Sequence, residues 1–132
     1  MKPSISIITI GVDDLERAFT FYRALLDIED EQIAPGEDHV AFFFDDDFSF
    51  VLFPRDQIAQ TAGKDVSIAG TPAFVLSHQA QSPADVDDIL RKVLIAGGAI
   101  IMEGTQSEWG YSAYFEDTEG NIWELMAQPA AN

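Results

Sequence analysis

The chain has 132 residues, of which 47% are hydrophobic and none is cysteine. This length and composition predict one compact domain, and the lack of thiols excludes disulfide scaffolds, thiolate zinc sites and cysteine nucleophiles. The 23 acidic residues against 7 Lys and Arg give a formal net charge of −16, which repels the phosphates of nucleic acids and anionic membranes. We therefore expect neither nucleic acid nor a membrane as a partner.

The acidic residues fall mostly on expected turns and helix faces, a pattern typical of a solvated surface. Attraction of a cationic ligand or partner is the alternative interpretation of the same charge. The N-terminal segment holds one Lys and a short apolar run broken by Ser and Thr, which indicates a first strand rather than a signal peptide. No stretch approaches the ~20 apolar residues of a membrane span. Because the chain has no cysteine, we expect a cytoplasmic protein.

The first half of the chain predicts a βαβββ module over residues 4–54. A β-branched strand at 5–10 leads into a helix, for which Asp13 is the expected N-cap, with Glu16 three residues later. The apolar positions of this helix recur at helical spacing. They are Leu15, Ala18, Phe19, Tyr22, Leu25 and Leu26. Three further strands are expected at 28–34, 39–44 and 48–53.

The second half repeats this pattern over residues 73–128, after an expected connector at 55–72. Ser82 is the expected N-cap of a second helix, Pro83 takes its first position, and Gly97 with Gly98 marks its end. The expected strands of this module lie at 73–80, 99–102, 111–116 and 122–127.

Strands 40–44 and 48–53 are apolar on both faces, since Phe42 and Phe50 alternate with residues such as Phe43 and Val51. A helix can cover one face, and a cavity satisfies the other. We therefore predict an α+β fold in which two mixed sheets form a cupped cleft and the helices pack on the outer face. Phe50 is one of the aromatic residues expected to contact a ligand in that cleft.

Glu124 stands in the otherwise apolar final strand, after an acidic turn at 117–121. A buried carboxylate needs a hydrogen-bond partner, a proton or a metal. One interpretation is that backbone amides or Trp and Tyr donors satisfy Glu124. The other is that it contacts a ligand, either as an acid or base with a raised pKa or by holding a cation beside aromatic rings. Glu124 is thus the best candidate for a catalytic residue.

Four aromatic residues near Glu124 are candidate walls of the ligand site. They are Trp109, Tyr111, Tyr114 and Trp123, with packing in the core as the alternative role. Tyr111 and Tyr114 are an odd number of positions apart, so a regular strand directs them to opposite faces. One is expected to line the cleft, and the other to meet a helix, solvent or a partner.

Three features of the chain carry a resemblance to a known family. They are the paired βαβββ layout, the segment from Gly11 to Tyr22, and the Trp109-Gly-Tyr and Trp123-Glu124 motifs. In these features the chain resembles the glyoxalase/bleomycin-resistance/extradiol-dioxygenase family, the vicinal oxygen chelate superfamily. The resemblance covers essentially the whole chain. It implies a divalent metal held between the two modules in catalytic members, with His or Glu ligands from the first and fourth strands of each. It also implies a homodimer.

Glu124 stands at the position of the family's last metal ligand. The other three metal-ligand positions fall at Ile7, at Val75 and near Leu52. A stable site needs three or four N, O or S donors, so we predict no metal and no cofactor. His78 lies three residues beyond Val75, on the opposite face of a regular strand, although a bulge would change this. His78 is therefore retained as a ligand-contacting candidate.

Two functions follow from this pattern. The favoured one is binding of a small organic molecule in an aromatic cleft without the usual metal. The alternative is a metal-dependent lyase, isomerase or dioxygenase, similar to lactoylglutathione lyase, in which Glu124, His78 and water would hold the metal.

Overall fold

The structure is a computed structural model that describes residues 1, 3, 5–57, 75–108 and 110–128. The chain divides into two compact units. The first unit comprises Met1–Phe19 and Leu26–Gly70, and the second comprises Thr20–Leu25 and Thr71–Asn132. The end of the first helix therefore belongs with the second half of the chain. Most of the expected connector at 55–72 lies outside the described residues.

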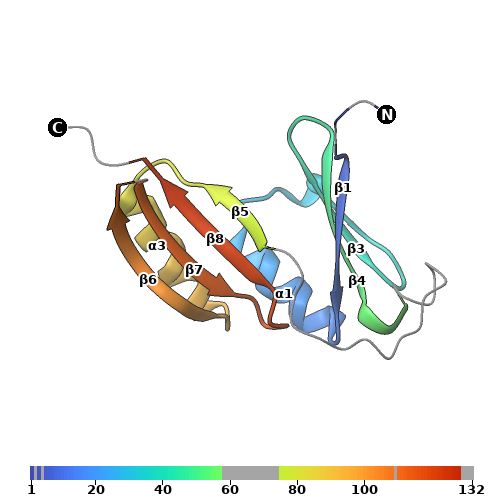
Figure 1. Ribbon diagram of the computed structural model, residues 1–132. Coiled ribbons are helices and arrows are strands. Elements are labelled where there is room, and N and C mark those ends of the chain that lie inside the picture. The colour runs from blue at the N-terminus through green and yellow to red at the C-terminus, as the bar shows by residue number, and fades with distance from the viewer. Residues whose placement is uncertain (2, 4, 58–74, 109, 129–132) are drawn as a thin grey trace. The chain divides into compact units, whose positions relative to one another are not determined.

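The first unit contains a four-stranded mixed sheet in the order β1-β4-β3-β2 (Figure 1). Strand β1 runs parallel to β4, whereas β4, β3 and β2 are successively antiparallel. The elements are β1 (Ile7–Val12), α1 (Leu15–Leu25), β2 (Ile33–Pro35), β3 (Val40–Phe44) and β4 (Phe48–Pro54).

Helix α1 is capped by Asp14, so the expectation of Asp13 was wrong by one residue. The Asp14 Oδ1 accepts the Arg17 N–H at 3.0 Å, and the Asp14 carbonyl accepts the Ala18 N–H at 3.0 Å. Strand β1 extends to Val12, two residues beyond its expected end, which moves the start of the helix along the chain. Asp13 instead accepts a hydrogen bond from Arg55 Nε at 3.2 Å.

The strand expected at 28–34 is mostly replaced by a short 3₁₀ helix, η1 (Asp30–Gln32). Gln32 Oε1 accepts the Glu29 N–H at 3.1 Å, and the Gln32 N–H donates to the Glu29 carbonyl at 2.9 Å. These local hydrogen bonds compete with strand pairing. Only Ile33–Pro35 joins the sheet, as β2.

The alternating faces of β3 and β4 separate two groups of apolar residues. Phe42 and Phe50 are cross-strand partners with ring centroids 6.2 Å apart, and Phe19 of α1 stacks on Phe42 at 6.0 Å. These rings form the core between the sheet and α1. The other face carries Ile7 and Phe43, whose side chains are exposed in this structure.

The second unit repeats the layout with a mixed sheet in the order β5-β8-β7-β6, and α3 lies across one face of it (Figure 1). The strand β5 is parallel to β8, and the other pairs are antiparallel. The elements are β5 (Val75–Gln79), α3 (Pro83–Ile95), β6 (Ala99–Ser107), β7 (Gly110–Glu116) and β8 (Ile122–Ala127). The predicted α+β fold with two mixed sheets is confirmed.

Both predicted ends of α3 are confirmed. The Ser82 Oγ accepts the Asp85 N–H at 3.1 Å, and Pro83 begins the helix. After the C-cap Ala96, Gly97 adopts a φ of +98°, which favours glycine, and its N–H donates to the Leu94 carbonyl at 3.2 Å. Strand β6 is longer than expected because it continues through register irregularities to Ser107.

The core of the second unit lies between α3 and the sheet. It also includes Phe21 from the end of α1. Its other members are Ala80, Val86, Leu90, Val93, Ala113, Phe115, Leu125 and Ala127. Within the described residues, no helix combines the length and apolar character needed to cross a membrane.

Candidate functional site

Glu124 lies in the middle of a row of three polar side chains across the second sheet. The register places Ser77 of β5 and Tyr114 of β7 directly beside it. The Ser77 hydroxyl donates to Glu124 Oε1 at 2.9 Å, and the Tyr114 hydroxyl donates to Glu124 Oε2 at 2.8 Å. Each carboxylate oxygen therefore accepts a hydrogen bond from a neutral donor on a neighbouring strand.

Strand alternation explains why a carboxylate is tolerated within an apolar strand. Leu125 is buried in the core beneath α3, and Trp123 packs against that core from the same face. Glu124 points to the other face, where it is only half-buried. The apolar neighbours thus hold β8 in place while the carboxylate stays accessible.

The two tyrosines of β7 point to opposite faces, as predicted. Tyr114 shares the face of Glu124, whereas the Tyr111 hydroxyl donates to Asp87 Oδ1 on α3 at 2.8 Å. The hydrogen bond to a carboxylate raises the pKa of each tyrosine above its usual value. Both phenols are therefore neutral at physiological pH.

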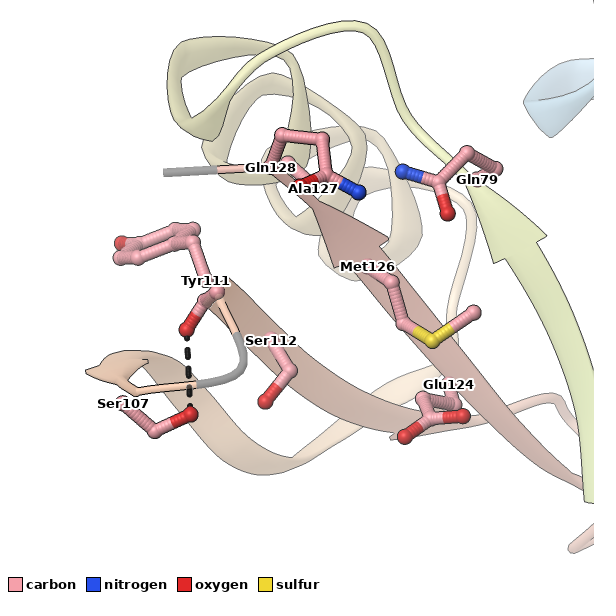
Figure 2. Close-up of a pocket in the computed structure, with 9 residues that line it drawn as sticks. Gln79, Ser107, Tyr111, Ser112, Glu124, Met126, Ala127 and Gln128 are labelled. Atoms are coloured by element: carbon pink, nitrogen blue, oxygen red, sulfur yellow. Dashed lines mark hydrogen bonds between the residues drawn. The ribbon is translucent and has the colours of Figure 1, made fainter. Parts of the chain in front are cut away.

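A pocket of about 260 Å³ opens beside Glu124 within the second unit. It is lined by Gln79, Ser107, Gly110, Tyr111, Ser112, Glu124, Met126, Ala127 and Gln128. Figure 2 shows Gln79, Met126 and Glu124 bordering it, whereas the Tyr111 ring points away from Glu124. Hydroxyl and carboxamide groups share this lining with apolar surface, and Tyr111 is the one predicted aromatic residue among the nine. The rings of Phe115 and Trp123 stack together on the other face of the sheet.

Two of the predicted ligand contacts, His78 and Phe50, lie apart from this pocket. His78 is the register partner of Leu125, so it belongs to the face opposite Glu124. Phe50 is 2% exposed within the core of the first unit and stacks on Phe42 and Phe44. Trp109 lies outside the described residues.

Apart from Glu124, the metal-ligand positions implied by the family resemblance carry apolar side chains. Val75 shares the face of Glu124, because its register partner is Ile122. In the first unit, Ile7 lies on the face without α1, whereas Leu52 is fully buried on the helix side. Across the described part of the chain, no three His, Cys, Asp or Glu side chains are grouped so that they could hold a metal ion. One carboxylate and two neutral hydroxyls do not fit the donor set of a divalent metal site.

Sequence reasoning missed a buried polar network just before β8. The Tyr22 hydroxyl donates to Asp117 Oδ2 at 2.5 Å, and Trp123 Nε1 donates to the Tyr22 hydroxyl at 3.1 Å. Asp117 also accepts hydrogen bonds at 2.8 Å from the Asn121 side chain and from the Asn121 and Glu119 N–H groups. Burial, followed by the Asp117 charge, raises the pKa of Tyr22 well above its usual value. The network holds the turn that leads directly into Trp123 and Glu124.

Comparison with known families and structures agrees with this architecture. The family model of the Glyoxalase/Bleomycin resistance protein/Dioxygenase superfamily matches residues 4–125. A glyoxalase-related enzyme from Fulvimarina pelagi has a TM-score of 0.83 at 19% identity, over 95% of this chain and 88% of that chain. No protein of curated function matches the sequence.

Two other structures with this fold carry more specific names. The fosfomycin resistance protein FosX from Listeria monocytogenes has a TM-score of 0.72 at 20% identity, over 98% of this chain and 97% of that chain. The lactoylglutathione lyase from Agrobacterium tumefaciens has a TM-score of 0.68 at 19% identity, over 96% of each chain. At these identities the structural likeness establishes the fold alone.

Proposed function

The chain belongs to the glyoxalase/bleomycin resistance protein/dioxygenase superfamily, and we propose that it binds a small organic molecule beside Glu124 without the divalent metal that the resemblance implies. The observation that carries this proposal is the position of the Glu124 carboxylate. It borders a pocket, and hydrogen bonds from Ser77 and Tyr114 hold it there.

The pocket has the features of a site for a small ligand. Its volume of about 260 Å³ lies just below the ~300–1,000 Å³ of pockets for drug-sized molecules. Gln79, Ser112 and Gln128 supply hydrogen-bonding groups, and Met126 supplies an adaptable apolar surface. A ligand with a short apolar part and one or two polar groups would match this lining.

The donor set supports binding without a metal. The alternative, a metal-dependent lyase, isomerase or dioxygenase, would need His78 as a second ligand beside Glu124. The regular register of β5 with β8 directs His78 to the opposite face. The hydroxyl groups of Ser77 and Tyr114 are neutral, so they cannot replace the missing histidines and carboxylates.

The charge of the lining argues against the ligand classes named for two of the structural relatives. Fosfomycin is a phosphonate, and lactoylglutathione carries carboxylates. Arg, Lys and His are absent from the nine lining residues, and Glu124 would repel an anion. We therefore expect neither compound to bind in this pocket.

The test is a titration of the ¹⁵N-labelled protein with benzyl alcohol, followed by the amide chemical shifts. We expect the largest changes at Ser112, Met126 and the Gln79 and Gln128 side chains, and weaker binding in Glu124→Ala. The control variant His78→Ala alters the opposite face and should bind as the unmodified protein does. Equal binding by Glu124→Ala, or shift changes confined to other parts of the chain, would refute the proposal.

A homodimer, the assembly that the family resemblance implies, is part of the same proposal. Exposed Ile95 and Ile101 in the second unit are apolar positions that an isologous contact would bury. Size-exclusion chromatography with light scattering tests it at micromolar concentration. A mass of 14.5 kDa, that of one chain, would contradict it.

A further inference from the structure

We infer that the ligand of the Glu124 pocket carries a primary ammonium group, which pairs with the Glu124 carboxylate. This inference rests on the proposed function and adds the chemical class of the ligand. It follows from the unused acceptor capacity of Glu124, from the lack of an ion pair to Glu124 in the described part of the chain, and from the neutral character of the remaining lining.

The carboxylate of Glu124 retains acceptor positions. A carboxylate has about four lone-pair sites. Ser77 occupies one on Oε1 and Tyr114 occupies one on Oε2, both from neighbouring strands of the same sheet. An ammonium group has three N–H donors, so it can bind the remaining positions from the pocket side.

The described residues of the second unit form no ion pair with Glu124. Among the described residues, Asp13 pairs with Arg55, Asp38 with His39 and Asp88 with Arg91, and none of these ion pairs involves Glu124. Ser77 and Tyr114 are neutral donors, which orient the carboxylate without cancelling its charge. A hydrogen bond from a cation to a carboxylate is about twice as strong as one between neutral groups.

The other lining residues select for one cation and against an anion. Glu124 is the single formally charged side chain of the nine, and the raised pKa of Tyr111 keeps its phenol neutral. Gln79, Gln128 and Ser112 can accept hydrogen bonds from the remaining ammonium N–H groups. The net charge of −16 attracts cations to the protein at long range.

Three probes of similar size and different charge separate the classes of ligand: benzylammonium, benzyl alcohol and benzoate. Titrations at low ionic strength, followed at the amides of Ser112 and Met126, should give a dissociation constant about tenfold lower for benzylammonium than for benzyl alcohol. Benzoate should not bind measurably. The preference for the ammonium probe should decrease at high salt.

Glu124→Gln removes the charge and keeps the shape, so it should abolish the preference for benzylammonium while benzyl alcohol still binds. Glu116→Gln is the matched control. Glu116 lies on β7, on the same face of the sheet as Glu124, so the substitution removes one charge from that face without altering the pocket lining. It should keep the preference. Equal affinity of the unmodified protein for the ammonium and alcohol probes overturns the inference but leaves the proposed function intact. No binding of either probe overturns both.

Discussion

Tyr22 and Asp117, 95 positions apart in the sequence, are joined in the second unit by a buried hydrogen bond of 2.5 Å. Asp117 is 4% exposed and lies in the turn before β8, whereas Tyr22 comes from the end of α1. The bond ties this part of α1 to the turn that precedes Glu124. The candidate site therefore depends on a contact that lies on the other face of the sheet.

Replacement of Tyr22 by Phe should lower the free energy of unfolding by about 1–3 kcal/mol, because it removes one hydrogen bond from Asp117 and the acceptor of Trp123 Nε1. Urea denaturation measures the change. Tyr114→Phe is the control, since it removes a hydrogen bond to a carboxylate at a more accessible position. Its cost should be about 1 kcal/mol or less. A larger cost for Tyr114→Phe than for Tyr22→Phe would contradict this account.

The same bond predicts a loss of stability at alkaline pH. Burial and the Asp117 carboxylate raise the pKa of Tyr22 in the folded chain well above its ordinary value of 10.0. The neutral phenol therefore contributes fully below about pH 10, and its contribution is lost as the pH rises toward the folded pKa. Unfolding measured between pH 8 and 11 should show a steeper decline for the unmodified protein than for Tyr22→Phe. Parallel curves would rule out this linkage.

Gly104 gives the Tyr111 hydroxyl room to reach Asp87. A Cβ at position 104 would overlap the Tyr111 hydroxyl and the adjoining ring carbon. Gly104→Ala should therefore lower the free energy of unfolding by about 1–3 kcal/mol. In a Tyr111→Leu background the same substitution should cost much less, because the ring that it displaces is gone. Equal costs in the two backgrounds, measured by denaturation, would show that Tyr111 is not the cause.

Local patterns in the sequence were sufficient to predict much of the fold. Ser82, Pro83 and Gly97 mark the ends of α3 through interactions with residues close to them in the chain, and the structure confirms both ends. The opposite orientation of Tyr111 and Tyr114 follows from strand alternation alone.

The errors arise where distant contacts decide between local alternatives. Asp13 and Asp14 are both suitable N-caps. Because β1 extends further than expected and Asp13 contacts Arg55, Asp14 caps the helix. The role of Ser77 was not predicted, because it depends on the parallel register of β5 with β8. Phe50 was assigned to a ligand site, since an apolar strand does not reveal which face the helix covers.

The dissociation constant of benzyl alcohol, measured with and without a divalent metal, tests the central claim most directly. The protein is dialysed against EDTA and titrated before and after addition of equimolar Mn²⁺ or Zn²⁺, with the amides of Ser112 and Met126 as reporters. We predict binding by the metal-free protein and the same dissociation constant after metal addition. Binding that appears only after metal is added would contradict the account.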